Sequence, residues 1–202
     1  WNRGYDKKPL DEVLQIGAVK LEGLGGRITD TFNAYIRPQV HQKLNPPAKR
    51  LPELERILSS EQTFPAAEAA PEEALARRIA VFPDSFFVAV ADGEIAGFIN
   101  GCVTDDRVIC DAMFEDPAYH KPDGQYQAVF GLDVSPRYQH QGLAHRLMEH
   151  LIADARRRGR KGLILTCKEH LIGFYGSFGY QNLGVSASVH GGAVWYDMIL
   201  IF

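Results

Sequence analysis

The residues from Gln139 to Ala144 read QHQGLA and lead directly into an amphipathic stretch. Gly142 and Ala144 keep side-chain bulk away from the backbone here. The first turn of a helix has amide groups without intrahelical partners, and the helix dipole adds positive potential there. Such amides bind phosphate groups. The sequence therefore predicts an anion site, suited to a pyrophosphate, at a helix start near Gly142, although an ordinary capped helix would carry the same residues.

The helix after this loop is predicted to end at Gly159. Arginines cluster in its last turn, and a glycine just beyond a helix commonly ends it. The loop is neither the GxxxxGK[ST] of P-loop proteins nor the GxGxxG of dinucleotide-binding folds. The apolar residues on one helical face are Leu143, Leu147, Leu151, Ile152 and Ala155.

Other elements must hold this helix in place, and they mix strands with helices. Asp92-Gly93 predicts a tight hairpin, and a second hairpin turns through 190–192. Gly131 predicts a bulge inside its strand. Hairpins combined with a strand–helix–strand crossover predict an α+β fold with a mixed sheet. Strands are expected at 11–21, 28–38, 85–91, 94–101, 126–134, 162–168 and 194–202, helices at 51–61, 71–81 and 171–178, and a polar loop at 104–125.

Composition excludes several classes of protein. The chain has 202 residues, is 46% hydrophobic and carries a net charge of -3, which fits one soluble domain with an appended segment. No stretch is long enough to span a membrane, and a mildly acidic chain does not predict a nucleic-acid surface. Three cysteines without CxxC spacing predict reduced thiols and a cytoplasmic location rather than disulfides or a zinc site.

The stretch LDVSPRYQHQGLAHRLMEHLI, with GLILTCKEHLIGFYGSFGY after it, resembles the GNAT superfamily of acyl-CoA-dependent N-acetyltransferases. Gln139, Gly142 and Ala144 match its phosphate-binding pattern, (Arg/Gln)-x-x-Gly-x-(Gly/Ala). The resemblance covers about residues 51–198 and is nearest to the arylalkylamine (serotonin-type) enzymes and their bacterial relatives. It implies the GNAT fold: a mixed central sheet flanked by helices, with a V-shaped splay between the strands near 126–134 and 162–168.

The resemblance also places acetyl-CoA as the cosubstrate and implies no metal. Pantetheine would bond to exposed backbone in the splay, and the phosphates would rest on the amides of the loop. The residues expected to bind the cofactor are Leu132, Asp133, Val134, Gln139, His140, Gln141, Gly142, Leu143, Ala144 and Phe178.

Tyr175 matches the family position whose phenol lies near the sulfur and acts as general acid toward the departing thiolate. Without the resemblance, packing beside Phe174 would explain this tyrosine equally well. Cys167 is not expected to carry the acyl group, because the family transfers it directly from thioester to amine.

The general base stays open. The arylalkylamine enzymes have a His-x-His pair on the strand before the phosphate loop, where this chain has Ala128 and Phe130. An ammonium with a pKa of about 10 must lose a proton before it can attack. Replacement bases to consider are His120, His170, His190, Glu169 or an ordered water, and each side chain could equally serve in packing or on the surface.

The acceptor is expected to be a small primary amine with a hydrophobic or aromatic tail. Residues 104–125 hold an acidic excess that would attract a cation, or that simply marks a solvated loop. Phe64 and Pro65 lie where relatives form an apolar lid, and Phe130 is expected to contact the amine. A homodimer is compatible with these features. The acidic residues are Asp105, Asp106, Asp111, Glu115, Asp116 and Asp123.

The first fifty residues resemble strands two and three of DnaQ-like 3′–5′ exonucleases. That family needs paired metal-binding carboxylates, and Glu12 alone cannot assemble a two-metal site. We therefore expect 1–50 to add a β-hairpin to a GNAT domain at 51–202, with residues 33–39 beside the sheet and 12–21 outside them. A natural fusion, a misjoined gene and a cloning product would all give this segment. The alternative functions are a non-catalytic acyl-CoA-binding module and, less favoured, a nuclease fragment.

Overall fold

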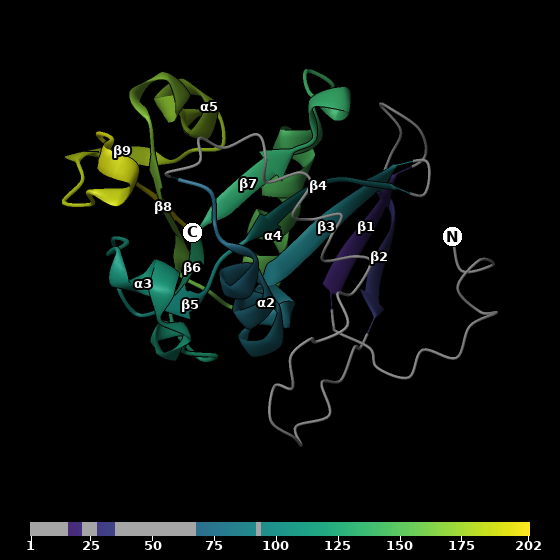
Figure 1. Ribbon diagram of the computed structural model, residues 1–202, viewed down its shortest axis with the longest axis horizontal. Coiled ribbons are helices and arrows are strands. Elements are labelled where there is room, and N and C mark those ends of the chain that lie inside the picture. Colours follow the sequence, from purple (N-terminus) through teal and green to yellow (C-terminus); the bar gives the residue numbers. More distant parts are fainter. Residues whose placement is uncertain (1–15, 22–27, 35–67, 92–93) are drawn as a thin grey trace.

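The computed structural model describes residues 16–21, 28–34, 68–91 and 94–202 (Figure 1). Its strands form two five-stranded sheets, in the orders β2-β1-β3-β4-β7 and β5-β6-β8-β10-β9. The strands are β1 Ile16–Leu21, β2 Ile28–Ala34, β3 Phe86–Ala91, β4 Glu94–Asn100, β5 Val103–Thr104, β6 Tyr126–Val129, β7 Gly131–Val134, β8 Gly162–Cys167, β9 Gln181–Val185 and β10 Tyr196–Ile201. The α-helices are α2 Glu72–Val81, α3 Ala112–Glu115, α4 Leu143–Arg157 and α5 Ile172–Gly176.

The two sheets separate at Phe130, which interrupts the strand predicted over 126–134. Before the break, β6 pairs in parallel with β8, from Tyr126↔Gly162 to Val129↔Leu165. After it, β7 pairs with β4 instead. The strands β7 and β8 therefore diverge, and the predicted V-shaped splay and mixed α+β fold are confirmed. The break falls at Phe130, whose amide bonds to the Asn100 carbonyl at 2.8 Å, and not at Gly131 as predicted.

Helices α2 and α4 cover opposite faces of the first sheet (Figure 1). Side chains alternate between the two faces of a sheet along each strand. Neighbouring residues of β3 therefore belong to two different clusters of buried hydrophobic side chains. Phe87 packs with Leu147 and Leu151 of α4, whereas Val88 packs with Leu75 of α2. Helix α4 also contacts β7 and β8, so it lies across both sides of the splay.

The N-terminal hairpin extends the first sheet in an order that differs from the prediction. Strand β1 pairs in parallel with β3 and antiparallel with β2, so β1 is the inner strand and β2 the edge. We had expected residues 33–39 beside the sheet and 12–21 outside. The inner position suits IGAVKL better than ITDTFNA, because a strand with neighbours on both sides favours an apolar sequence.

Several local predictions are confirmed. Strands β3 and β4 form the antiparallel hairpin expected around Asp92-Gly93. Helix α4 begins after Gly142 and ends before Gly159, which has a φ of 71°. Strand β10 returns antiparallel to β9. The expected polar loop at 104–125 contains the short helix α3.

Some predictions fall on residues that the structure does not describe, namely the helix at 51–61 and the residues Glu12, Phe64 and Pro65. All three cysteines are free thiols. Within the described ranges, no helix has the length and apolar character needed to cross a membrane. In the same ranges, no group of three or more His, Cys, Asp or Glu side chains is arranged to hold a metal ion.

Candidate active site

The loop before α4 presents backbone amides without protein partners. Gly142 is the N-cap in the left-handed conformation, with φ 77° and ψ 6°, and no side chain caps the helix. His140 also has a positive φ of 60°. In the described part of the chain, the amides of residues 140–142 donate no hydrogen bond, and the first-turn amides of residues 143–145 have no intrahelical acceptor. Exposed His140, Gln141 and Gly142 therefore border a set of free donors.

Gly142 has a backbone conformation that favours glycine. A positive φ strains any L-residue with a side chain. A Cβ atom at this position would meet no protein atom within 4 Å. Inside the protein the constraint on Gly142 is therefore its backbone, and the prediction that glycine keeps bulk away from a bound phosphate stays a prediction.

Side-chain hydrogen bonds fix the shape of the loop. The Gln139 Nε2 donates to the Val134 carbonyl at 3.0 Å, and the Gln141 Nε2 donates to the Arg137 carbonyl at 3.2 Å. Leu143 is buried in the core, and Ala144 packs beside it. The Gln139 side chain therefore ties the loop to β7 instead of pointing freely to a ligand.

The free edge of β7 faces the splay. The Ser135 amide donates to the Ala96 carbonyl of β4 at 2.9 Å. Backbone groups alternate in an antiparallel pair, so Asp133, two residues earlier, also faces β4. This corrects the expectation that Asp133 offers its backbone to a ligand. By the same alternation the backbone groups of Leu132 and Val134 face away from β4, and the Val134 carbonyl accepts from the Gln139 side chain.

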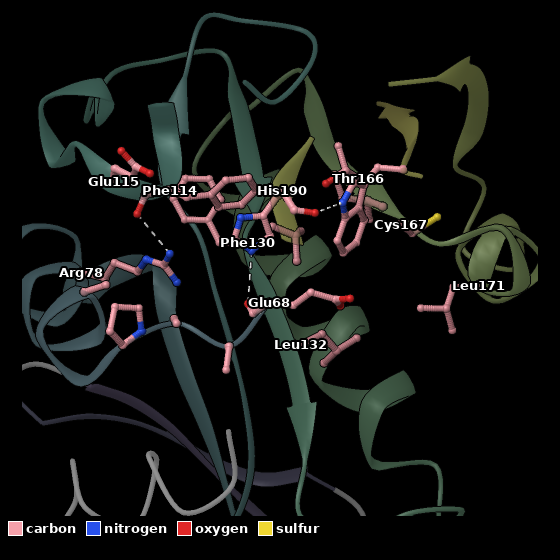
Figure 2. Close-up of a pocket in the computed structure, with 18 of the residues that line it drawn as sticks. Glu68, Arg78, Phe114, Glu115, Phe130, Leu132, Thr166, Cys167, Leu171 and His190 are labelled. Carbon is pink, nitrogen blue, oxygen red and sulfur yellow. Dashed lines mark hydrogen bonds between the residues drawn. The ribbon is translucent and has the colours of Figure 1, made fainter. Parts of the chain in front are cut away.

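A cavity of about 280 Å³ lies in the splay (Figure 2). Phe130 and Leu132 line it from the side of β7, and Thr166 and Cys167 line it from β8. Tyr175 of α5 also contributes to the wall, as do residues of α2, α3 and the segment between β9 and β10. The splay therefore contains a space large enough for a small reacting group, lined by Leu132 of β7, the strand that precedes the loop.

Tyr175 is buried, with 8% of its surface exposed, between the rings of Phe174 and Tyr180 at 5.0 and 6.0 Å. Burial, with a smaller contribution from the Cys167 thiol, raises the pKa of Tyr175 well above its usual value. The phenol therefore stays protonated at neutral pH.

Cys167 is a buried thiol in the same wall. Burial raises its pKa to about 11. Because the thiolate is the nucleophilic form, this environment disfavours an acyl-cysteine intermediate.

Of the four side chains considered as bases, only His190 lines the cavity. His120 lies elsewhere: its Nδ1 accepts from the Val103 amide at 3.2 Å, and its ring stacks on Phe82 at 5.2 Å. Glu169 and His170 are exposed in the turn after β8. The structure thus separates candidates that sequence reasoning left equivalent.

Sequence reasoning missed Glu68. Its carboxylate, 9% exposed, lines the cavity and pairs with the Lys168 Nζ at 2.7 Å. In the sequence, Glu68 is the one acidic residue of the loop TFPAAEAA, residues 63–70, in which Phe64 and Pro65 predict an apolar lid. That single charge could have indicated a polar group in the site.

Aromatic side chains form much of the remaining wall (Figure 2). The Phe114 ring lies 5.0 Å from Phe130 and 5.2 Å from His190. Lys168 lies 5.7 Å from the Trp195 ring. Aromatic faces favour flat apolar groups and cations. The predicted contact of Phe130 with the acceptor is compatible with its place in this wall.

The acidic stretch at 104–125 contributes less to the cavity than expected. Asp105 pairs with Lys121 at 3.3 Å, and Asp116 accepts from the Ala118 amide at 2.8 Å. Glu115 is its only acidic residue in the cavity wall among the described residues. Phe178 also lies outside the wall, with its ring 4.3 Å from His145 in the first turn of α4.

Comparisons with known proteins agree with this geometry. The sequence profile of the acetyltransferase (GNAT) family matches residues 51–180. A search of curated proteins finds no match. The loading GNATL domain of CurA from Lyngbya majuscula is 15% identical, with a TM-score of 0.64 over 74% of this chain and 92% of that chain.

Two further solved structures are similar. The GphF GNAT-like decarboxylase in complex with isobutyryl-CoA is 19% identical, with a TM-score of 0.61 over 74% of this chain and 94% of that chain. The ribosomal-protein-S18-alanine N-acetyltransferase from Escherichia coli is 22% identical, with a TM-score of 0.52 over 73% of this chain and 86% of that chain. At these identities the likeness shows the fold alone.

Proposed function

Because the chain belongs to the acetyltransferase (GNAT) family, we propose that it moves an acetyl group from acetyl-CoA to a small primary amine. The predicted superfamily is confirmed, whereas the arylalkylamine and exonuclease-like relationships stay predictions. The observation that carries the proposal is the continuity of three features: free amides before α4, the open edge of β7, and a cavity containing Tyr175.

Acetyl-CoA would bind mainly through backbone. The diphosphate would accept from the amides of residues 140–144, and pantetheine would enter the splay beside Leu132. Complexes of other GNAT proteins with CoA and with isobutyryl-CoA support a CoA ester as the ligand. In this arrangement the thioester reaches the cavity near Tyr175.

The chemistry requires a neutral amine and a proton for the leaving group. The amine nitrogen attacks the thioester carbonyl carbon, the C–N bond forms and the C–S bond breaks. Tyr175 would then give its proton to the sulfur. The raised pKa keeps that proton on the phenol at neutral pH until the thiolate forms.

The aromatic wall supports an amine with an apolar or aromatic tail. Phe114, Phe130 and Trp195 would contact the tail. The wall carboxylates Glu68 and Glu115 are accompanied by Lys168, which pairs with Glu68, and by two arginines, so the aromatic rings and not the net charge carry this part of the proposal. Phe64 and Pro65 remain predicted lid residues outside the described ranges.

The test is amine-dependent release of free thiol from acetyl-CoA, measured with arylalkyl amines, polyamines and peptide amines. We expect arylalkyl amines to give the highest kcat/KM. Tyr175→Phe should lower kcat at least about 10-fold with CoA affinity unchanged. CoA binding without thiol release from any amine would instead support the non-catalytic binding module.

A second candidate function is decarboxylation of a carboxylated acyl-CoA, as in the name of the similar GphF structure. The observation in its favour is that Arg77 of α2 contributes to the cavity wall, where a guanidinium can hold a carboxylate. Consumption of malonyl-CoA with release of carbon dioxide, without any amine, would distinguish it from acetyl transfer.

A further inference from the structure

His190 differs from the other histidines because its ring forms part of the cavity wall (Figure 2). The imidazole is half-buried and lies between two aromatic rings. Its centroid is 5.2 Å from that of Phe114 and 6.2 Å from that of Trp195. The ring therefore faces the space in which the acceptor amine would lie.

The backbone on both sides of this imidazole is fixed by hydrogen bonds. Asp111 accepts from the Ser188 hydroxyl and from the Val189 amide, the latter at 3.0 Å. The His190 amide donates to the Ser188 Oγ at 3.3 Å. The Trp195 Nε1 donates to the His190 carbonyl at 2.8 Å. Residues 188–195 therefore hold the ring in one place before any ligand arrives.

The partner of the ring fixes which nitrogen carries hydrogen. The His190 Nε2 lies 3.2 Å from the backbone carbonyl oxygen of Glu68. A carbonyl oxygen only accepts, so Nε2 must be the donor in this contact. In the neutral imidazole, Nδ1 then carries the lone pair, and it has no hydrogen-bond partner among the described residues.

We propose that the Nδ1 atom of His190 is the general base that activates the acceptor amine. This inference rests on the proposed function. The ammonium gives one proton to Nδ1, and the freed lone pair forms the C–N bond while the C–S electron pair stays on sulfur. The sulfur takes the proton of the Tyr175 phenol. The nitrogen then loses its second proton, which reprotonates the Tyr175 oxygen. The imidazolium of His190 finally releases its proton to solvent.

Glu68 and Glu115 are the competing bases in the wall. The Glu68 carboxylate is already paired with the Lys168 Nζ at 2.7 Å. Glu115 is exposed to solvent. An imidazole with a free lone pair is better suited to accept a proton near neutral pH.

The experiment compares His190→Gln with Glu68→Gln, Glu115→Gln and His170→Gln, the last being an exposed control. Wild-type thiol release with the best amine is measured first. We expect His190→Gln to lower kcat at least about 100-fold, with KM and the CoA Kd changed less than about 3-fold. The acid limb of the kcat/KM profile should change in this variant so that it follows the ionisation of the amine itself, whose pKa is about 10, and should be unchanged in His170→Gln.

Imidazole rescue of His190→Ala gives a second measurement that does not depend on one variant folding well. Added imidazole should restore amine-dependent turnover to His190→Ala and leave wild type unchanged. Three results would each overturn the inference. The first is a wild-type kcat with an unchanged acid limb in His190→Gln, and the second is a folded His190→Ala that imidazole does not rescue. The third is a loss of kcat in Glu68→Gln or Glu115→Gln in place of His190→Gln. Absence of thiol release from wild type with any amine overturns the proposed function and the base together.

Discussion

Among single residues, the proposed binding of CoA depends on backbone groups more than on side chains. Gly142 has a conformation that other residues avoid, and in the described part of the chain the amides of residues 140–142 donate no hydrogen bond. Tyr175 and His190 line the cavity and are the two proton-transfer groups that we propose. The binding part of the site is therefore encoded by one glycine and its neighbours, and the reactive part by residues from other elements.

Gly142→Ala tests the binding part. Alanine favours a negative φ, so we expect a loss of about 1 kcal/mol in the free energy of unfolding and about a 10-fold weaker CoA Kd. Gly159→Ala is the matched control, because Gly159 has a φ of 71° at the other end of α4 and also has nothing within 4 Å of an added Cβ. It should lose similar stability and keep its CoA affinity, as measured by denaturation and calorimetry. Equal CoA affinities in the two variants would contradict a role for the loop.

At the scale of elements, the separation of β7 from β8 creates the cavity. Gly101 matters here because it joins β4 to β5 where Ala128 of β6 comes very close. A Cβ at Gly101 would lie 1.9 Å from the Ala128 carbonyl oxygen. Only glycine permits this approach between the segments that flank the break at Phe130.

Gly101→Ala should therefore destabilise the fold by roughly 3 kcal/mol or more, since backbone would have to move. The control is Gly173→Ala in α5, where an added Cβ meets nothing within 4 Å. Alanine favours helix, so the control should be neutral or up to about 1 kcal/mol more stable. Urea denaturation of both variants measures the difference, and equal stabilities would argue against this packing.

Elements differ in how much of them the sequence predicts. The start of α4 could be predicted because a glycine directly precedes an amphipathic pattern. The break at Phe130 could not, since an aromatic residue in YQAVFGLDV looks like an ordinary strand position. His190 could not be selected either, because its place depends on Asp111, 77 residues from Ser188 in the chain. Local sequence patterns predict the helices, the strands and the phosphate-type loop. Contacts between residues far apart in the chain determine which side chains line the cavity.

At the scale of the whole molecule, stability should depend on pH through buried thiols. Burial raises the pKa of Cys102 from 9.0 to about 12. The unfolded chain loses this proton above pH 9, while the folded chain keeps it. The free energy of unfolding should therefore be insensitive to this group below pH 9 and fall between pH 9 and 12, by up to about 1.4 kcal/mol per pH unit.

Cys102→Ala should make the alkaline fall in stability less steep. A contribution from Cys167 remains, as does one above pH 10 from Tyr175 and Tyr180, because burial raises the pKa of each of these groups. Cys110→Ala is the control, because Cys110 is exposed. Chemical denaturation at several pH values between 8 and 11 gives the slopes. An identical slope in wild type and Cys102→Ala would show that the Cys102 thiol does not titrate differently in the folded state.

The whole chain also contains a segment that the family does not explain. The family profile begins at residue 51, whereas β1 and β2 lie before it and extend the first sheet. The sequence predicts that this segment forms a β-hairpin. The order of its strands could not be predicted, because it depends on which strand packs better between two neighbouring strands, and that strand is β1. The exonuclease-like origin of this segment and the domain boundary near residue 50 stay predictions.

The central claim is that a CoA ester occupies the splay, with its diphosphate on the loop before α4. The most direct measurement is a crystal structure of the protein grown with CoA. The account predicts density for the diphosphate at the amides of residues 140–144 and for pantetheine between β7 and β8, with the sulfur near Tyr175. CoA bound on another surface, or an empty splay at saturating CoA, would contradict it.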